Sequence, residues 1–180
     1  MHKRHMKLRI VFFLAFFSVS VPQYGQFLIP GEGIMDVKIG ADRDEVEWEL
    51  GFKGIRLTKE EVSPAMAYIA QQAGIDFDYA VSYRHLMWLP VTDLLFKSDK
   101  VCLVALNSYH DYNQMLCVDI GTTEGLNFWE DADAVNKIYG QQKILKDKGR
   151  SYMFYPGRGI GVEMLDNEIR AMFIFMAQLK

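Results

Sequence analysis

Ile39-Gly-Ala-Asp-Arg-Asp-Glu-Val-Glu-Trp-Glu-Leu-Gly51 has a counterpart 89 positions later, Phe128-Trp-Glu-Asp-Ala-Asp-Ala-Val-Asn-Lys-Ile-Tyr-Gly140. The offset aligns acids, a valine and a final glycine: Asp42 with Asp131, Asp44 with Asp133, Val46 with Val135, and Gly51 with Gly140. Each copy predicts one short helix, because an N-cap aspartate, acids in the first turn and a closing glycine are helix boundary signals.

Each copy is followed by two apolar segments that a short polar turn separates, which is typical of a β-hairpin. The four expected strands are Val91–Phe96, Val101–Leu106, Gly159–Leu165 and Ile169–Met176. An additional helix in the first copy is expected to begin at Ser63-Pro64 and to end at Gly74. We therefore predict an α+β fold, an antiparallel sheet with helices packed on one face. Two related strand-helix-hairpin units, residues 31–120 and 121–180 approximately, would build it.

The first copy carries a short motif that resembles that of small bacterial envelope proteins. It consists of Gly33-Ile34, Ile39-Gly40, Asp42, Val46 and Leu50-Gly51, and the second half matches it at Asp131, Val135 and Gly140. The motif is similar to that of the SmpA/OmlA (BamE) type and of the tandem repeats of the β-lactamase-inhibitor-protein fold. The resemblance implies a two-layer α+β architecture and a function through protein contacts without catalysis. The chain departs from the BamE type by lacking a lipobox cysteine.

The first 25 residues have the layout of a secretory signal peptide. Residues 1–9 are basic and Ile10–Val21 is apolar, with the small residues Ser18 and Ser20 near the end of the apolar run and Gly25 after it. As a helix the apolar run would span only ~18 Å, short of a ~30 Å hydrocarbon core. We expect cleavage after Ser20 or Gly25. Residues 26–180 would then form a single α+β domain without a membrane span, periplasmic or secreted.

Removal of this segment makes the protein more acidic. It contains four of the 20 Lys and Arg residues and none of the 23 Asp and Glu residues, so the net charge changes from −3 to −7. Such a charge disfavours binding to nucleic acid or to an anionic membrane. It favours a partner that is another exported protein with a cationic contact surface.

Two cysteines in an exported protein predict a disulfide. Cys102 and Cys117 lie in strand-like segments on either side of a loop rich in turn-forming residues. A hairpin centred between Tyr109 and His110 would place them opposite one another, where Cα atoms can lie ~4.5 Å apart. The alternative is two reduced, buried cysteines that serve as small apolar residues.

No arrangement of residues predicts catalysis. Ser82, His85 and Asp93 lie close along one extended stretch, and the alternation of a strand would direct Ser82 and His85 to opposite faces. The histidines and cysteines lack the spacing of a metal site. Paired acids lie at helix starts, where the helix dipole favours them. We expect no enzyme activity, cofactor or metal.

An exposed, tyrosine-rich loop is the predicted contact surface, because tyrosine gives a large contact area at low entropic cost. Its residues are Tyr109, His110, Asp111 and Tyr112, unless the tyrosines fold back over their own hairpin. The sequence thus predicts a non-catalytic exported protein-binding module of inhibitor, immunity or envelope-assembly type. The alternative is a small-molecule-binding protein or small enzyme with a cleft between the half-repeats, lined by Arg158, His85 or Trp88.

Overall fold

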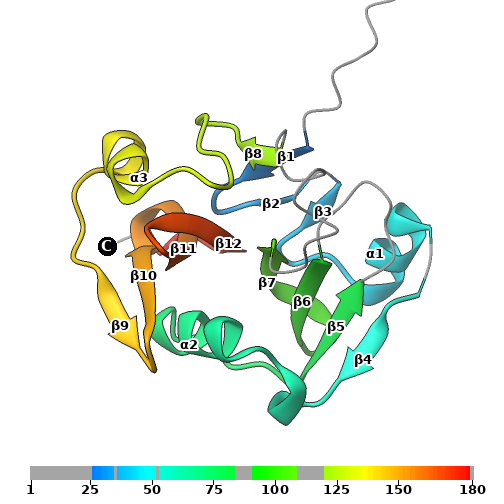
Figure 1. Ribbon diagram of the computed structural model, residues 1–180. Helices are drawn as coiled ribbons and strands as arrows, with labels where there is room; N and C mark the ends of the chain where they lie inside the picture. The colour runs from blue at the N-terminus through cyan, green and yellow to red at the C-terminus, as the bar shows by residue number, and fades with distance from the viewer. Residues whose placement is uncertain (1–25, 35, 52, 84–90, 109–119, 179–180) are drawn as a thin grey trace, which may run out of the picture.

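The computed structural model describes residues 26–34, 36–51, 53–83, 91–108 and 120–178 (Figure 1). Over these residues the chain forms three α-helices, an eight-stranded antiparallel sheet and a mixed four-stranded sheet. The predicted α+β class is confirmed. The expected signal peptide, residues 1–25, lies outside the described residues.

The large sheet forms the centre of the molecule, with strand order β4-β5-β6-β7-β12-β11-β10-β9. Its strands are β4 (Ile55–Leu57), β5 (Tyr79–Tyr83), β6 (Val91–Lys97), β7 (Lys100–Asn107), β9 (Leu145–Asp147), β10 (Arg150–Tyr155), β11 (Ile160–Leu165) and β12 (Glu168–Phe175). The two predicted hairpins, β6–β7 and β11–β12, are present. They meet at the middle of the sheet, where Ala105 of β7 pairs with Phe173 of β12.

Both hairpins turn in the same way. The two central turn residues have positive φ in each: Ser98 (50°), Asp99 (58°), Asp166 (53°) and Asn167 (66°). Two-residue turns with φ > 0 at both positions match the right-handed twist of the flanking strands, and Asn and Asp tolerate this conformation well. Local turn chemistry therefore accounts for both hairpins.

The small sheet and two helices cover one face of the large sheet. The sheet has the order β3 (Val37–Lys38), β2 (Gly33–Ile34), β1 (Gln26–Ile29), β8 (Ile120–Thr122), with β1 and β8 parallel. The helices are α1 (Arg43–Leu50) and α3 (Ala132–Tyr139). Val46 of α1 and Val135 of α3 are fully buried in this core, as the sequence predicts.

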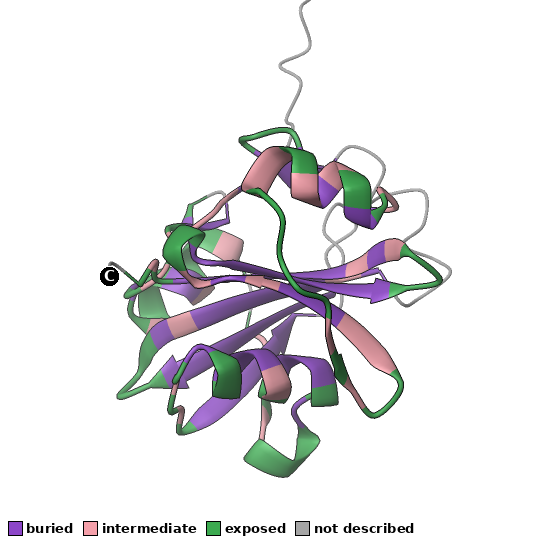
Figure 2. Cartoon of the chain, turned by 90° about the vertical axis from the view of Figure 1, so that its left-hand side faces the viewer, coloured by how far each residue is buried: buried purple, intermediate pink, exposed green. Residues whose placement is uncertain are grey.

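Helix α2 (Pro64–Gln72) packs on the opposite face of the large sheet. Its residues Met66 and Ile69 join a second apolar core with Leu95, Leu103 and Phe173. Figure 2 shows the buried strands lying between helices on both sides. The prediction that the helices share one face is therefore wrong for α2. The central strands are apolar on both faces, and such strands need cover on both sides.

The helix ends follow the predicted signals with one exception. Ser63 accepts a hydrogen bond from Met66 N (3.2 Å), and Asp131 accepts one from Ala134 N (2.9 Å). Gly51 ends α1 in the left-handed conformation. Asp42 makes no cap hydrogen bond and instead forms an ion pair with Lys100 (3.0 Å).

Two short 3-10 helices complete the described helices: η1 (Lys59–Glu61) and η3 (Pro156–Arg158). None of the described helices is long and apolar enough to cross a bilayer.

Candidate functional site

A cavity of about 140 Å³ lies against the face of the large sheet that carries α2. Its polar lining residues are Ser63, Asp93, Asn107, Arg150 and Glu163. They come from the start of α2 and from strands β6, β7, β10 and β11. The cavity therefore lies where the β6–β7 hairpin meets the β11–β12 hairpin.

Small side chains create the space. Ala105 of β7, Ala171 of β12 and Ala65 of the first turn of α2 all line the cavity. In the sheet register Ala171 lies between Asn107 on one side and Glu163 on the other. Three methyl groups leave room at this position, because neighbouring rows of the same core hold larger side chains such as Leu103.

Glu163 is the most unusual residue of the cavity, because a carboxylate with 0% exposure is rare in a protein core. One carboxylate oxygen, Oε1, accepts a hydrogen bond from Nη1 of Arg150 in an ion pair. The other, Oε2, has no hydrogen-bond partner among the described residues. An ionised carboxylate can only accept hydrogen bonds, and leaving one oxygen unsatisfied in a buried site costs free energy. The site thus has an acceptor to offer a ligand.

Acids outnumber bases among the described residues that line the cavity. Asp93, which is 9% exposed, and Glu163 give two carboxylates, and Arg150 gives one guanidinium. Tyr152, paired with Glu163 across β10 and β11, has its pKa raised to about 12, first by burial and then by the charge of Glu163. The phenol is therefore neutral at physiological pH and adds no charge beside the carboxylate.

Two isolated acids within apolar segments of the sequence indicate this site, and neither belongs to a pair of neighbouring acids. Glu163 stands in Gly161-Val-Glu-Met-Leu165, and Asp93 stands in Val91-Thr-Asp-Leu-Leu-Phe96. Each is a single acid inside an apolar strand, in contrast to the acids at helix starts. A charged residue within such a strand is buried unless the strand lies at an edge, and a buried charge indicates a specific partner or a functional role.

The residues that the sequence predicts for a functional site do not all lie in the described part of the chain, and those that do are not all at the cavity. Tyr109, His110, Asp111 and Tyr112 lie outside the described residues, as do His85, Trp88 and Cys117. Arg158 is exposed in η3 and does not line the cavity. Ser82 and Asp93, considered for a triad, lie opposite one another on β5 and β6, and both are buried. The described residues contain no group of three or more acids, histidines or cysteines that could hold a metal.

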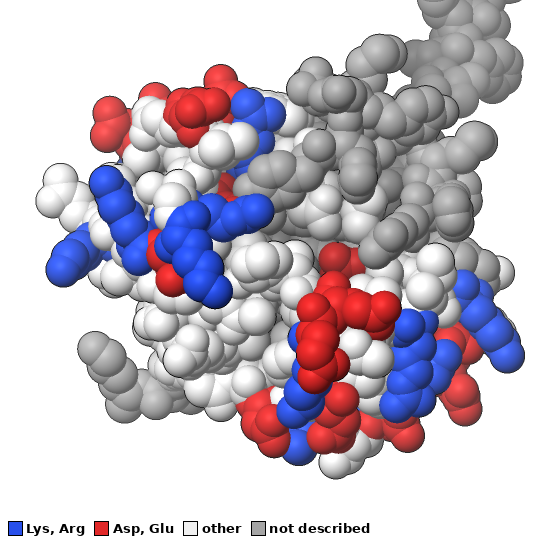
Figure 3. Space-filling model, turned by 60° about the horizontal axis from the view of Figure 1, so that its bottom comes forward, with Lys and Arg blue, Asp and Glu red and all other residues white. Residues whose placement is uncertain are grey.

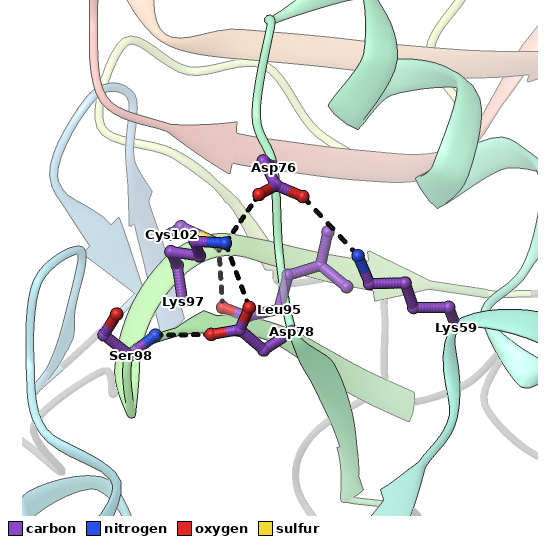
Figure 4. Close-up of polar contacts among 7 residues, drawn as sticks. All are labelled: Lys59, Asp76, Asp78, Leu95, Lys97, Ser98 and Cys102. Carbon is purple, nitrogen blue, oxygen red and sulfur yellow. Dashed lines mark hydrogen bonds and ion pairs between the residues drawn. The ribbon is translucent and has the colours of Figure 1, made fainter.

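Cys102 is half-buried on β7 and forms no disulfide within the described part of the chain. Its Sγ donates a hydrogen bond to the carbonyl oxygen of Leu95, 3.3 Å away (Figure 4). Burial raises the pKa of this thiol to about 11. The thiol is therefore protonated at neutral pH and is a poor nucleophile.

The partner that the predicted hairpin would give Cys102 lies outside the described residues, because Cys117 is not among them. Strand β7 has β6 on one edge and β12 on the other, with β12 paired along residues 103–107 of β7. Both edges of β7 are therefore paired over residues 103–107. The next described strand, β8, pairs with β1 in the small sheet. The disulfide itself stays a prediction.

Near Cys102, a cluster of ion pairs attaches the β6–β7 turn to the segment after α2 (Figure 4). Lys97 Nζ lies 2.5 Å from Asp76 Oδ2 and 3.0 Å from Asp78 Oδ1, and Ser98 N donates to Asp78 Oδ2 (2.8 Å). Lys59 adds a longer contact of 3.5 Å to Asp76. These exposed charges are already paired with one another, so the cluster serves to hold the turn.

The exposed surface is uneven in charge and polarity. Figure 3 shows Lys and Arg side chains gathered on the side that carries β9, where Lys143, Lys146 and Lys148 are exposed. Lysines along an edge strand discourage pairing with strands of other molecules. Trp48 of α1 is 78% exposed, which makes it the most exposed large apolar side chain among the described residues.

Comparisons with known proteins do not assign the chain to a family. No family model matches the chain, and no curated protein and no solved structure matches it either. The resemblance to envelope proteins of the BamE type stays an expectation from the sequence motif. The cavity around Glu163 is thus the feature from which a function can be inferred.

Proposed function

We propose that the protein is an exported, non-catalytic module that binds another exported protein through a surface that includes the cavity. The observation that carries this proposal is the buried Glu163 carboxylate, whose Oε2 lacks a hydrogen-bond partner among the described residues. A protein partner that inserts a hydrogen-bond donor would satisfy this oxygen. Export rests on the predicted signal peptide, and residues 109–112 stay a second predicted contact.

The size of the cavity favours a protein partner over a free small molecule. Sites for drug-sized ligands commonly measure ~300–1,000 Å³, whereas this cavity measures about 140 Å³. It can hold the end of one side chain. A protein that inserts a single side chain gains the remaining contact area from the surrounding surface, as interfaces with a central anchor do.

We also propose that the two halves of the large sheet are structural repeats. Two matching bridges support this: Asp42 before α1 pairs with Lys100, and Asp131 before α3 pairs with Glu168. Each bridge is accompanied by a backbone hydrogen bond from the preceding segment, to Val101 in the first half and to Ile169 in the second.

The strand register gives further support for the repeat. The β6–β7 ladder shifts between Leu95 and Phe96, and the β11–β12 ladder shifts between Glu163 and Met164. Counted back from the turn, both shifts fall at the same position, so Glu163 corresponds to Leu95. Leu95, which is apolar and packs against α2, thus occupies in one half the position that the buried Glu163 carboxylate occupies in the other. Such a difference between the halves is expected if only one of two copies acquired a binding site.

Affinity capture tests the protein-binding proposal. Full-length chain is expressed in an exporting host, and the purified wild type, Glu163→Gln and Glu49→Gln are immobilised and exposed to envelope extract of the native cell. Glu49 is an exposed acid of α1 and gives a matched control for the loss of one charge. We expect a protein retained by wild type and Glu49→Gln and depleted about tenfold or more with Glu163→Gln. No selectively retained protein, or equal retention by all three, would refute the proposal.

A small molecule is the second candidate ligand, since polar groups converge on a cavity between the hairpins, as the alternative hypothesis expects. Native mass spectrometry of the purified protein tests this directly. A co-purified adduct in the wild type that is missing from Glu163→Gln would favour a small-molecule-binding protein over the protein-binding module.

A further inference from the structure

We infer that the cavity is a binding site for one organic cation, a primary ammonium or a guanidinium such as the end of a lysine or arginine side chain. Glu163 would accept hydrogen bonds from the cation through Oε2, and the Asp93 carboxylate on the same lining would add negative charge. In the function proposed above, this cation is the group of the protein partner that enters the cavity. That the cation belongs to a protein rests on the proposed function.

The hydrogen bonding and charge of Glu163 indicate what kind of ligand can bind. Its Oε1 already accepts from Nη1 of Arg150, and its Oε2 lies buried without a partner among the described residues. A carboxylate oxygen only accepts hydrogen bonds, so the ligand must carry N–H or O–H donors. An anion placed against this carboxylate would be repelled strongly in a site of low dielectric constant, whereas a cation would be attracted. The ligand is therefore a cation with hydrogen-bond donors.

The dimensions of the cavity limit the size of the ligand. The cavity measures about 140 Å³. A cavity of about 150 Å³ accommodates one benzene molecule. A guanidinium or ammonium with one or two carbons fits that space. Ala65, Ala105 and Ala171 offer methyl groups to those carbons. Among the described residues, the lining has no group of three or more acids, histidines or cysteines that could hold a metal ion.

Calorimetric titration of the full-length exported protein with methylguanidinium and with methylammonium tests the site. Tetramethylammonium, which has no N–H group, and acetate, which is an anion, are the matched control ligands. We expect saturable binding of the first two to wild type, binding at least about tenfold weaker to Glu163→Gln, and no binding of the controls. No saturable binding of either N–H cation to wild type, which is the result for a cavity filled by water only, would overturn the inference. So would equal binding of tetramethylammonium.

Two further variants separate recognition from folding. Ala171→Leu fills the cavity without removing a charge, so it should abolish cation binding even if Glu163→Gln fails to fold. Arg150→Gln removes the competing guanidinium and should tighten cation binding about threefold or more. If Glu163 only stabilises the fold, Glu163→Gln and Arg150→Gln will both lower the melting temperature, and neither will change cation binding.

The outcomes distinguish the cation site from the proposed function. Cation binding that depends on Glu163, with no protein retained in the capture experiment, would support the site and refute the protein partner. A protein retained through Glu163, with no binding of either N–H cation, would support the protein partner and refute the cation site.

Discussion

Cys102 illustrates how the surroundings of one residue determine its chemistry. Its thiol donates to the Leu95 carbonyl at the register shift of the β6–β7 ladder, and burial raises its pKa to about 11. The thiolate is the reactive form of cysteine, so a raised pKa makes this side chain inert while the protein is folded. Its position therefore favours a structural role over a catalytic one.

Thiol labelling tests this property at the level of the single residue. In Cys117→Ser, where Cys102 has no cysteine partner, alkylation of the folded protein at neutral pH should be at least about tenfold slower than in denaturant. Equal rates would contradict the burial of the thiol. In the wild-type exported protein, labelling in denaturant should find no free thiol if the predicted disulfide to Cys117 forms, and two labelled thiols would exclude it.

The β6–β7 hairpin is the element whose position depends most visibly on charge. Asp78 accepts hydrogen bonds from Ser98 N and from Lys97 Nζ, and these contacts, in that order of size, lower its pKa below the ordinary 3.8. The pKa of Asp76 is also lowered, chiefly by Lys97. The ionised carboxylates thus hold the turn against the segment that follows α2.

The pH dependence of stability follows from the sign of these shifts. A carboxyl group with a lower pKa in the folded state stabilises the fold above its unfolded pKa of 3.8, and this contribution is lost as the pH falls through the folded value. Asp78→Asn should therefore lower the melting temperature at neutral pH and converge with wild type in acid. Thermal melts over a pH series measure this. Asp36→Asn, at an exposed position, is the control, and a deficit for Asp78→Asn that persists at acid pH would contradict the mechanism.

Across the whole molecule, the large sheet is stabilised by two separate apolar cores. The first core, beneath the small sheet, includes Val46 of α1 and Val135 of α3, both with 0% exposure. The second includes Met66 and Ile69 of α2. Helices α1 and α3 therefore contribute to one core on the first face, and α2 contributes to the core on the other face.

Val46→Asp and Val135→Asp test the proposed structural repeat. Each places an unpaired charge in the same core, so each should lower the free energy of unfolding by about 3 kcal/mol or more. Urea denaturation followed by circular dichroism measures the loss. Ile144→Asp, at a position 43% exposed, should change stability by only about 0.5 kcal/mol. A small effect of Val135→Asp alone would contradict the equivalence of the two helices.

The sequence alone determined the features that depend on neighbouring residues. The cap at Asp131, the start of α2 at Ser63-Pro64 and the two tight hairpin turns were all predictable, because caps and turns are formed by residues a few positions apart. The burial of Val46 and Val135 was predictable from the aligned copies. These signals were sufficient for the α+β class.

Only the tertiary structure decided which distant segments meet. Strand β7 is apolar on both faces, and no local pattern indicates that its second partner is β12. The same ambiguity concealed the face on which α2 packs. Glu163, Asp93 and Arg150 come from three different strands, and only the strand order brings their charges to one cavity. The candidate site is thus a product of long-range pairing, since the interactions that build it join residues far apart in the chain.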